Sequence, residues 1–114
     1  MGWLGSSAAL ALLTFDVDAE SPILAEGGRH AGNPVAMSHQ AYGPLVAVPR
    51  LLELLAEYSL PATFFVPGLT ADRYPQAVER ILASGHEVGH HSYAHHSPVD
   101  QDPQAERADR KSVV

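Results

Sequence analysis

Two short motifs contain residues whose types and spacing suit metal-assisted hydrolysis. Asp16 and Asp18 stand two positions apart after an apolar run, and His91 and His95 stand four apart in the segment HSYAH. Histidines at i and i+4 share one face of a helical turn and can bind one divalent cation, and in a loop they could equally converge. Two imidazoles and one carboxylate, with a position left for water, are typical of a catalytic zinc site rather than a closed structural one.

Each motif also has a purely structural explanation. Aspartates routinely form side-chain turns or cap helices, so Asp16 and Asp18 could simply end a strand. His91 and His95 could belong to a solvated polar loop. The two motifs together are more specific than either one, because α/β folds place their active sites at the carboxyl ends of their strands.

A third motif, HEVGH at residues 86–90, matches the H-E-x-x-H signature of zincin proteases. That signature needs a helix, whereas Gly85 is placed to end a helix and Val88 and Gly89 favour a strand. In a strand its two histidines would lie about 13 Å apart at ~3.3 Å per residue, too far for one ion. We therefore expect a strand here and reject the protease interpretation.

Three strands separated by helices are predicted to position these motifs. An apolar run predicts a strand at residues 8–15 that is buried on both faces. β-branched and aromatic residues predict a second strand at 62–66, and the short segment 86–91, which lacks helix formers, predicts a third. The stretch 18–40 has glycines, prolines and no periodicity, so it predicts a long functional loop. The order β-α-β-α-β, with a further helix starting near the polar C-terminal stretch, predicts an α/β fold with a parallel sheet or barrel.

The helices between these strands are expected to bury one apolar stripe each. The first begins near the Gly-Pro pair at 43–44 and ends at 59–61, and the second runs from about 72–75 to 84, with Gly85 after its end. A third is expected within 101–110. Residues at helical spacing form the two stripes: Val48, Leu51, Leu52 and Leu55 in the first helix, and Val78, Ile81 and Leu82 in the second.

Composition limits the class of protein. The chain has 114 residues, 46% of them hydrophobic, which is normal for one globular domain. Its formal net charge of −6 argues against nucleic-acid and anionic-membrane partners. Cysteine is absent, which excludes disulfide scaffolds, thiolate zinc sites and cysteine nucleophiles. No apolar run approaches the roughly 20 residues of a spanning helix, so we expect a cytoplasmic protein.

The motifs TFDVDAE at residues 14–20 and HSYAH at 91–95 together resemble the polysaccharide deacetylase family (NodB homology, carbohydrate esterase 4). The segments ATFFVPG at 62–68 and GHEVGH at 85–90 resemble the branch with peptidoglycan-deacetylase-like and allantoinase- or cyclic-imide-hydrolase-like proteins. The resemblance covers roughly residues 8–107. It implies the N-terminal portion of a distorted (β/α) barrel, because three parallel strands alone leave bare edges.

The resemblance also implies roles for the four motif residues. Asp16 matches the family's catalytic base, and Asp18, His91 and His95 match its metal ligands, with Zn²⁺ as the first expectation and other divalent ions open. The implied activity is metal-dependent hydrolysis of non-peptide carbon–nitrogen bonds in carbohydrate metabolism. The expected substrate is an N-acetylated glycan or a small cyclic amide, and a homo-oligomer is a further expectation.

The family's later motifs, which supply an arginine that orients the base and a histidine general acid, have no match in residues 97–114. We therefore expect residues 1–108 to form the N-terminal part of a deacetylase domain that is inactive alone. Residues 109–114 break the expected helical pattern and can be encoded by adapter-like DNA, so they are expected to be a non-native tail. The alternative function is a non-catalytic truncated remnant that binds metal or sugar.

Overall fold

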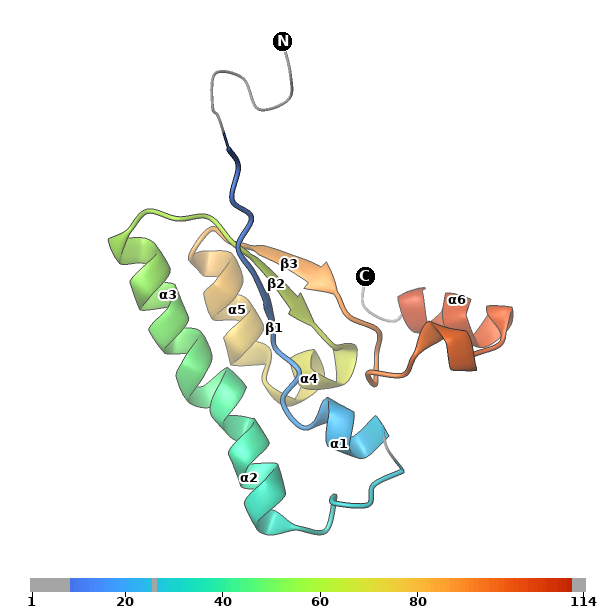
Figure 1. The fold of residues 1–114 in the computed structure, drawn as a ribbon. Coiled ribbons are helices and arrows are strands. Elements are labelled where there is room, and N and C mark those ends of the chain that lie inside the picture. The colour runs from blue at the N-terminus through green and yellow to red at the C-terminus, as the bar shows by residue number, and fades with distance from the viewer. Residues whose placement is uncertain (1–8, 26, 112–114) are drawn as a thin grey trace.

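Parallel strands form the centre of the molecule. The computed structural model describes residues 9–25 and 27–111, and within them β1 (Thr14–Asp16), β2 (Thr63–Val66) and β3 (Glu87–His90) make one sheet in the order β1-β2-β3 (Figure 1). Both strand pairs are parallel, so the carboxyl ends of all three strands lie at one edge of the sheet. The α/β class and the predicted β-α-β-α-β order of elements along the chain are confirmed.

Helices make both crossovers between the strands. In Figure 1, α2, η1 and α3 form one continuous helical segment, called the rod below, that joins β1 to β2. Helices α4 and α5 join β2 to β3. After β3 come a short 3₁₀ turn and a last helix. The bounds are α1 (Ser21–Ala25), α2 (Pro34–Tyr42), the π-helical η1 (Gly43–Ala47), α3 (Val48–Glu57), α4 (Gly68–Arg73), α5 (Pro75–Ala83), η2 (Pro98–Asp100) and α6 (Pro103–Lys111).

The core lies between the central strand and the helices α3 and α5. Phe64 of β2 and Ile81 of α5 are fully buried, and Val48, Leu52 and Leu55 of α3 pack with them as predicted. The stripe predicted on α5 is only partly right. Ile81 is buried and Val78 is half-buried, as expected, but Leu82 is exposed. Ala77 is buried instead of Leu82, so the buried face of α5 is centred on Ala77 and Ile81.

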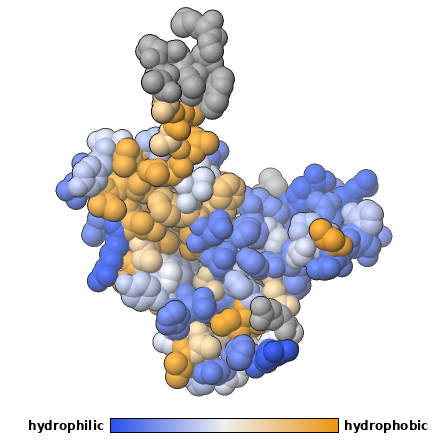
Figure 2. Space-filling view, viewed as in Figure 1, coloured by the Kyte–Doolittle hydropathy of each residue, from blue (hydrophilic) through white to orange (hydrophobic). Residues whose placement is uncertain are grey.

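The first strand is shorter and more exposed than predicted. Only Thr14, Phe15 and Asp16 form β1, with Phe15 half-buried and its two neighbours exposed, and Leu12 is 79% exposed. Among the described residues β1 pairs with β2 alone, so it is an edge strand that an apolar run cannot distinguish from a central one. Figure 2 shows apolar residues gathered around the start of β1. Ala8 of the predicted strand lies outside the described residues.

The prediction of a long loop over residues 18–40 is wrong, because this stretch contains α1 and most of α2. Asn33 caps α2, since its Oδ1 accepts hydrogen bonds from the N–H groups of Val35 and Ala36. Pro34 then occupies the first turn, where proline is favoured. The helix that was expected to begin near the Gly-Pro pair at 43–44 therefore begins earlier, and that pair lies in the π-helical turn within the rod.

The C-terminal helix α6 bears out the helix predicted within residues 101–110. Asp102 caps it by accepting hydrogen bonds from the N–H groups of Gln104 and Ala105, both 2.9 Å long. The helix runs on through Lys111, so the expected break in helical pattern at Asp109 is absent. Residues 112–114 lie outside the described residues, and the non-native origin of the tail stays a prediction. No described helix is long and apolar enough to cross a membrane.

Gly89 allows β3 to pair closely with β2, which generates a testable prediction. A Cβ at Gly89 would lie 2.6 Å from ring atoms of Phe65, its partner in the register. Gly89→Ala should therefore displace the ring and lower the free energy of unfolding by about 1–3 kcal/mol. Chemical denaturation measures this. Gly43→Ala, at a helical φ of −51° with open space around the site, is the control and should not destabilise. Equal stability of the Gly89 variant and the parent would contradict the close approach.

Candidate metal centre

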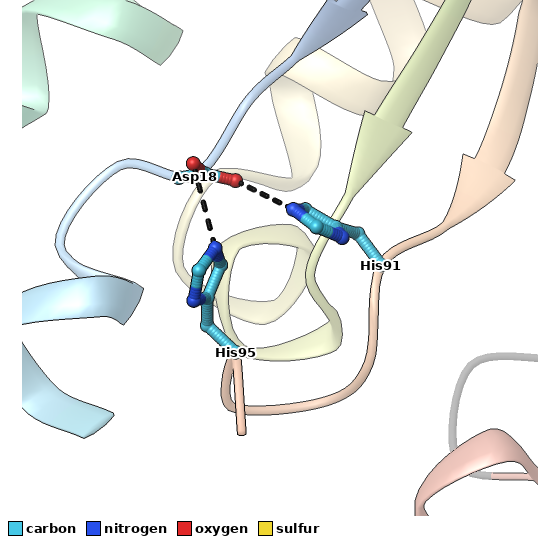
Figure 3. A group of neighbouring side chains, drawn as sticks. All are labelled: Asp18, His91 and His95. Atoms are coloured by element: carbon cyan, nitrogen blue, oxygen red, sulfur yellow. Dashed lines mark ion pairs between the residues drawn. The ribbon is translucent and has the colours of Figure 1, made fainter. Parts of the chain in front are cut away.

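Asp18, His91 and His95 meet at the carboxyl edge of the sheet, and Figure 3 shows their side chains pointing toward one another. Nε2 of His91 lies 3.2 Å from Oδ1 of Asp18, and Nε2 of His95 lies 3.6 Å from Oδ2. One ligand atom from each residue falls within 4.8 Å of the others. The structure therefore brings together the three residues that the sequence analysis assigned as metal ligands.

The cluster fits a divalent cation. Tetrahedral zinc bonds of ~2.0–2.2 Å place ligand atoms about 3.3 Å apart, close to the 3.2 and 3.6 Å between the histidine nitrogens and the two Asp18 oxygens. Oδ1 of Asp18 is buried and makes no hydrogen bond to a described residue, so its contact with His91 is not a hydrogen bond. A buried oxygen that makes no hydrogen bond is costly, and a cation would satisfy it. The three side chains are 32–34% exposed, which leaves an approach for water or substrate.

The end of β1 presents Asp18 to the cluster. Val17 is buried and donates its N–H to the carbonyl of Phe65 at 2.8 Å, and side-chain alternation along the strand turns its neighbours the opposite way. The backbone then turns at Ala19, whose φ is +51°. Ser21 closes this turn by donating from its N–H and its hydroxyl to the Asp18 carbonyl, at 3.1 and 2.7 Å.

The two histidines lie in a loop. Of the two arrangements considered for HSYAH, the structure therefore has the loop and not the helical turn. Ser92 and His95 both have positive φ, at +52° and +61°, which is unfavourable for residues with a Cβ. The loop follows β3 directly, and its rings meet edge to face, with the His91 and His95 centroids 4.8 Å apart. Asp109 of α6 supports the loop because its Oδ1 accepts the Tyr93 N–H at 2.8 Å.

Asp16 lies beside the cluster and is not part of it. Its side chain is exposed at the end of β1, and it lines a hollow together with Asp18, His39 and Tyr42. The residue is therefore near the cluster and open to solvent, and its role as the base stays a prediction. Residues Glu87–His90 of the HEVGH segment form β3, as expected, so its two histidines do not share a helical face.

Glu20, the last residue of the TFDVDAE motif, is a buried acid whose partners the sequence analysis did not identify. Its side chain is 4% exposed, the hydroxyl of Tyr74 donates to its Oε1 at 2.5 Å, and Arg73 lies 3.7 Å away. Burial and the neighbouring Glu20 carboxylate raise the pKa of Tyr74 to about 12. Both partners are distant in sequence, so no local pattern could have revealed the pairing.

The fold and the cluster define an α/β protein with a candidate divalent-cation site, and comparisons with known proteins give its family. The sequence profile of the polysaccharide deacetylase family matches residues 32–113. A candidate polysaccharide deacetylase from Mycobacterium smegmatis superposes with a TM-score of 0.95 at 46% identity, over 100% of this chain and 40% of that one. An allantoinase superposes with a TM-score of 0.75 at 18% identity, over 100% of this chain and 47% of that one, a likeness of fold alone.

Curated relatives agree with this family. The peptidoglycan deacetylase of Helicobacter pylori is 37% identical over 84 residues, which are 74% of this chain and 28% of the relative. A chitooligosaccharide deacetylase of Sinorhizobium fredii is 48% identical over 50 residues, 44% of this chain and 23% of the relative. The chain belongs to the polysaccharide deacetylase family, and it spans about a quarter of the length of these curated relatives.

The Tyr74–Glu20 pair predicts a specific pH dependence of stability. Because the pKa of Tyr74 is raised on folding, the bond stabilises fully below pH ~10 and is lost as the pH rises toward about 12. Tyr74→Phe should lower the free energy of unfolding by about 1–2 kcal/mol at pH 7, and this difference should shrink above pH 10. Denaturation at several pH values measures it, with Tyr58→Phe, at an exposed tyrosine, as the control. If Tyr74→Phe lowered the free energy of unfolding by as much at pH 11 as at pH 7, the stabilising Tyr74–Glu20 hydrogen bond would be contradicted.

Proposed function

We propose that this chain carries the metal centre of a metal-dependent hydrolase that removes acetyl groups from N-acetylated sugars of a glycan. The observation that carries the proposal is the convergence of Asp18, His91 and His95 within 4.8 Å at the carboxyl edge of the sheet, in a member of the polysaccharide deacetylase family. One carboxylate and two imidazoles suit Zn²⁺ first among the divalent ions.

The chemistry assigns separate roles to the two aspartates. A divalent cation in this cluster supplies Lewis acidity, which makes water more acidic and polarises a carbonyl group. Asp16, exposed beside the cluster, acts as the general base and takes a proton from the attacking water. Water adds to the acetyl carbon, the carbon–nitrogen bond breaks with a proton passing to nitrogen, and the products are acetate and a free amine. Asp18 holds the cation and takes no proton.

A glycan is the favoured substrate class. The relatives are named for peptidoglycan and chitooligosaccharide, which both contain N-acetylated sugars. The one-third exposure of the three cluster side chains also suits a substrate that extends beyond the site. The allantoinase shares the fold, but at only 18% identity. Cyclic amides are therefore the alternative substrate class, and the assay includes them for comparison.

The protein expressed from the complete reading frame that encodes this chain tests the proposal directly. Metal-loaded protein is incubated side by side with N-acetylated chitooligosaccharides, peptidoglycan fragments, allantoin and a cyclic imide, and acetate and free amine are measured. We expect equal amounts of acetate and amine from the N-acetylated glycans. Turnover of allantoin or the imide alone would contradict the substrate class. No turnover of any substrate would favour a non-catalytic protein that binds metal or sugar.

Two substitutions in the same protein distinguish the roles of the two aspartates. Asp18→Ala should lose both metal and activity, as should His91→Ala or His95→Ala. Asp16→Asn keeps the shape of the side chain but cannot accept the proton, so it should retain metal while kcat falls about 100- to 10,000-fold. Metal content and kcat are measured on each variant, with the exposed Asp100→Asn as the control. Metal lost from the Asp16 variant and retained by the Asp18 variant would reverse the two roles.

A further inference from the structure

Helix α4 contacts both loops that carry the cluster. Its first two N–H groups, from Gly68 and Leu69, donate to the carbonyls of Ser92 and Tyr93 at 3.0 and 2.8 Å. These carbonyls lie between the two cluster histidines in the sequence. One residue further along α4, the hydroxyl of Thr70 donates to the main-chain carbonyl of Asp18 at 2.7 Å.

The order of the strands explains why such a link is needed. Asp18 follows β1 and the histidines follow β3, but β2 lies between these strands, so the two loops are not joined by strand pairing. Helix α4 begins two residues after the end of β2 and therefore lies between the loops. It is the element that ties the carboxylate half of the cluster to the imidazole half.

The backbone conformation of the two loops is a second reason why they need support from the rest of the fold. Ala19, Ser92 and His95 all have positive φ, a conformation that is unfavourable for residues with a Cβ and persists only where the surroundings enforce it. Thr70 is 2% exposed, so its hydroxyl is shielded from competing water. Ser21 binds the same carbonyl from within the turn, whereas Thr70 fixes that turn to the rest of the fold.

We propose that Thr70 is a positioning residue of the metal centre: its hydroxyl fixes the Asp18 turn at the distance from the histidine loop that a single cation requires. This inference rests on the proposed metal site. Thr70 acts through Asp18 and does not itself reach the cation. Removing the hydroxyl should therefore lower metal affinity by about 10- to 100-fold, the effect typical of groups that orient a ligand.

The test compares Thr70→Ser with Thr70→Ala in the 114-residue chain. Both remove the methyl group and only the serine keeps the hydroxyl, so their difference isolates the hydrogen bond. Zn²⁺ affinity is measured by competition with a chromophoric chelator, and Co²⁺ absorption reports the geometry of the site. Thermal denaturation in EDTA gives the stability of each metal-free variant. Thr63→Val is the matched control, because it removes another 2.7 Å hydroxyl bond, to Glu87, at the opposite end of the sheet.

We expect the serine variant to bind Zn²⁺ nearly as tightly as the parent, the alanine variant to bind 10- to 100-fold more weakly with an altered Co²⁺ spectrum, and Thr63→Val to bind normally. Equal affinities of the serine and alanine variants overturn the positioning role, even if alanine lowers stability. Should the unsubstituted chain bind no metal, the proposed metal centre fails and this inference fails with it. Binding by the parent with no difference between the variants overturns this inference alone.

Discussion

Parallel pairing of the three strands is the constraint on which the cluster depends. Because β1 and β3 both run parallel to β2, the residues that follow them leave the sheet at the same edge. Asp18 and His91 are 73 positions apart in the sequence, yet their side-chain atoms lie 3.2 Å apart. An antiparallel arrangement would send one of these two loops to the opposite edge, and no choice of side chains could then rebuild the cluster.

Hydrogen bonds to the main chain fix the positions of the two loops that strand pairing brings to the same edge of the sheet. Strand order places the two loops near each other, but it leaves their separation to the turns that carry Asp18 and the histidines. The Asp18 carbonyl is held by Ser21 and Thr70, and the histidine loop by the start of α4. A divalent cation tolerates little error in the placement of its ligands, so these hydrogen bonds connect the stability of the fold to the chemistry of the site.

The sequence predicted the parts of this structure that depend on local pattern. The stripe of Val48, Leu52 and Leu55, and the strand character of HEVGH, follow from periodicity and composition and were confirmed. The ligand set came from a resemblance, and the structure places its members together. Contacts between distant residues were not predictable: nothing near Thr70 marks it as a partner of Asp18. The exposed edge of β1 was missed because an apolar run does not reveal how many strands flank it.

The central claim is that Asp18, His91 and His95 hold one divalent cation, and X-ray absorption at the zinc edge of the Zn²⁺-loaded chain tests it most directly. The account predicts one zinc per chain, with a first shell of nitrogen and oxygen at about 2.0–2.1 Å and the outer-shell scattering of two imidazole rings. A zinc shell without imidazole scattering, or a chain that retains no zinc after dialysis, would contradict it.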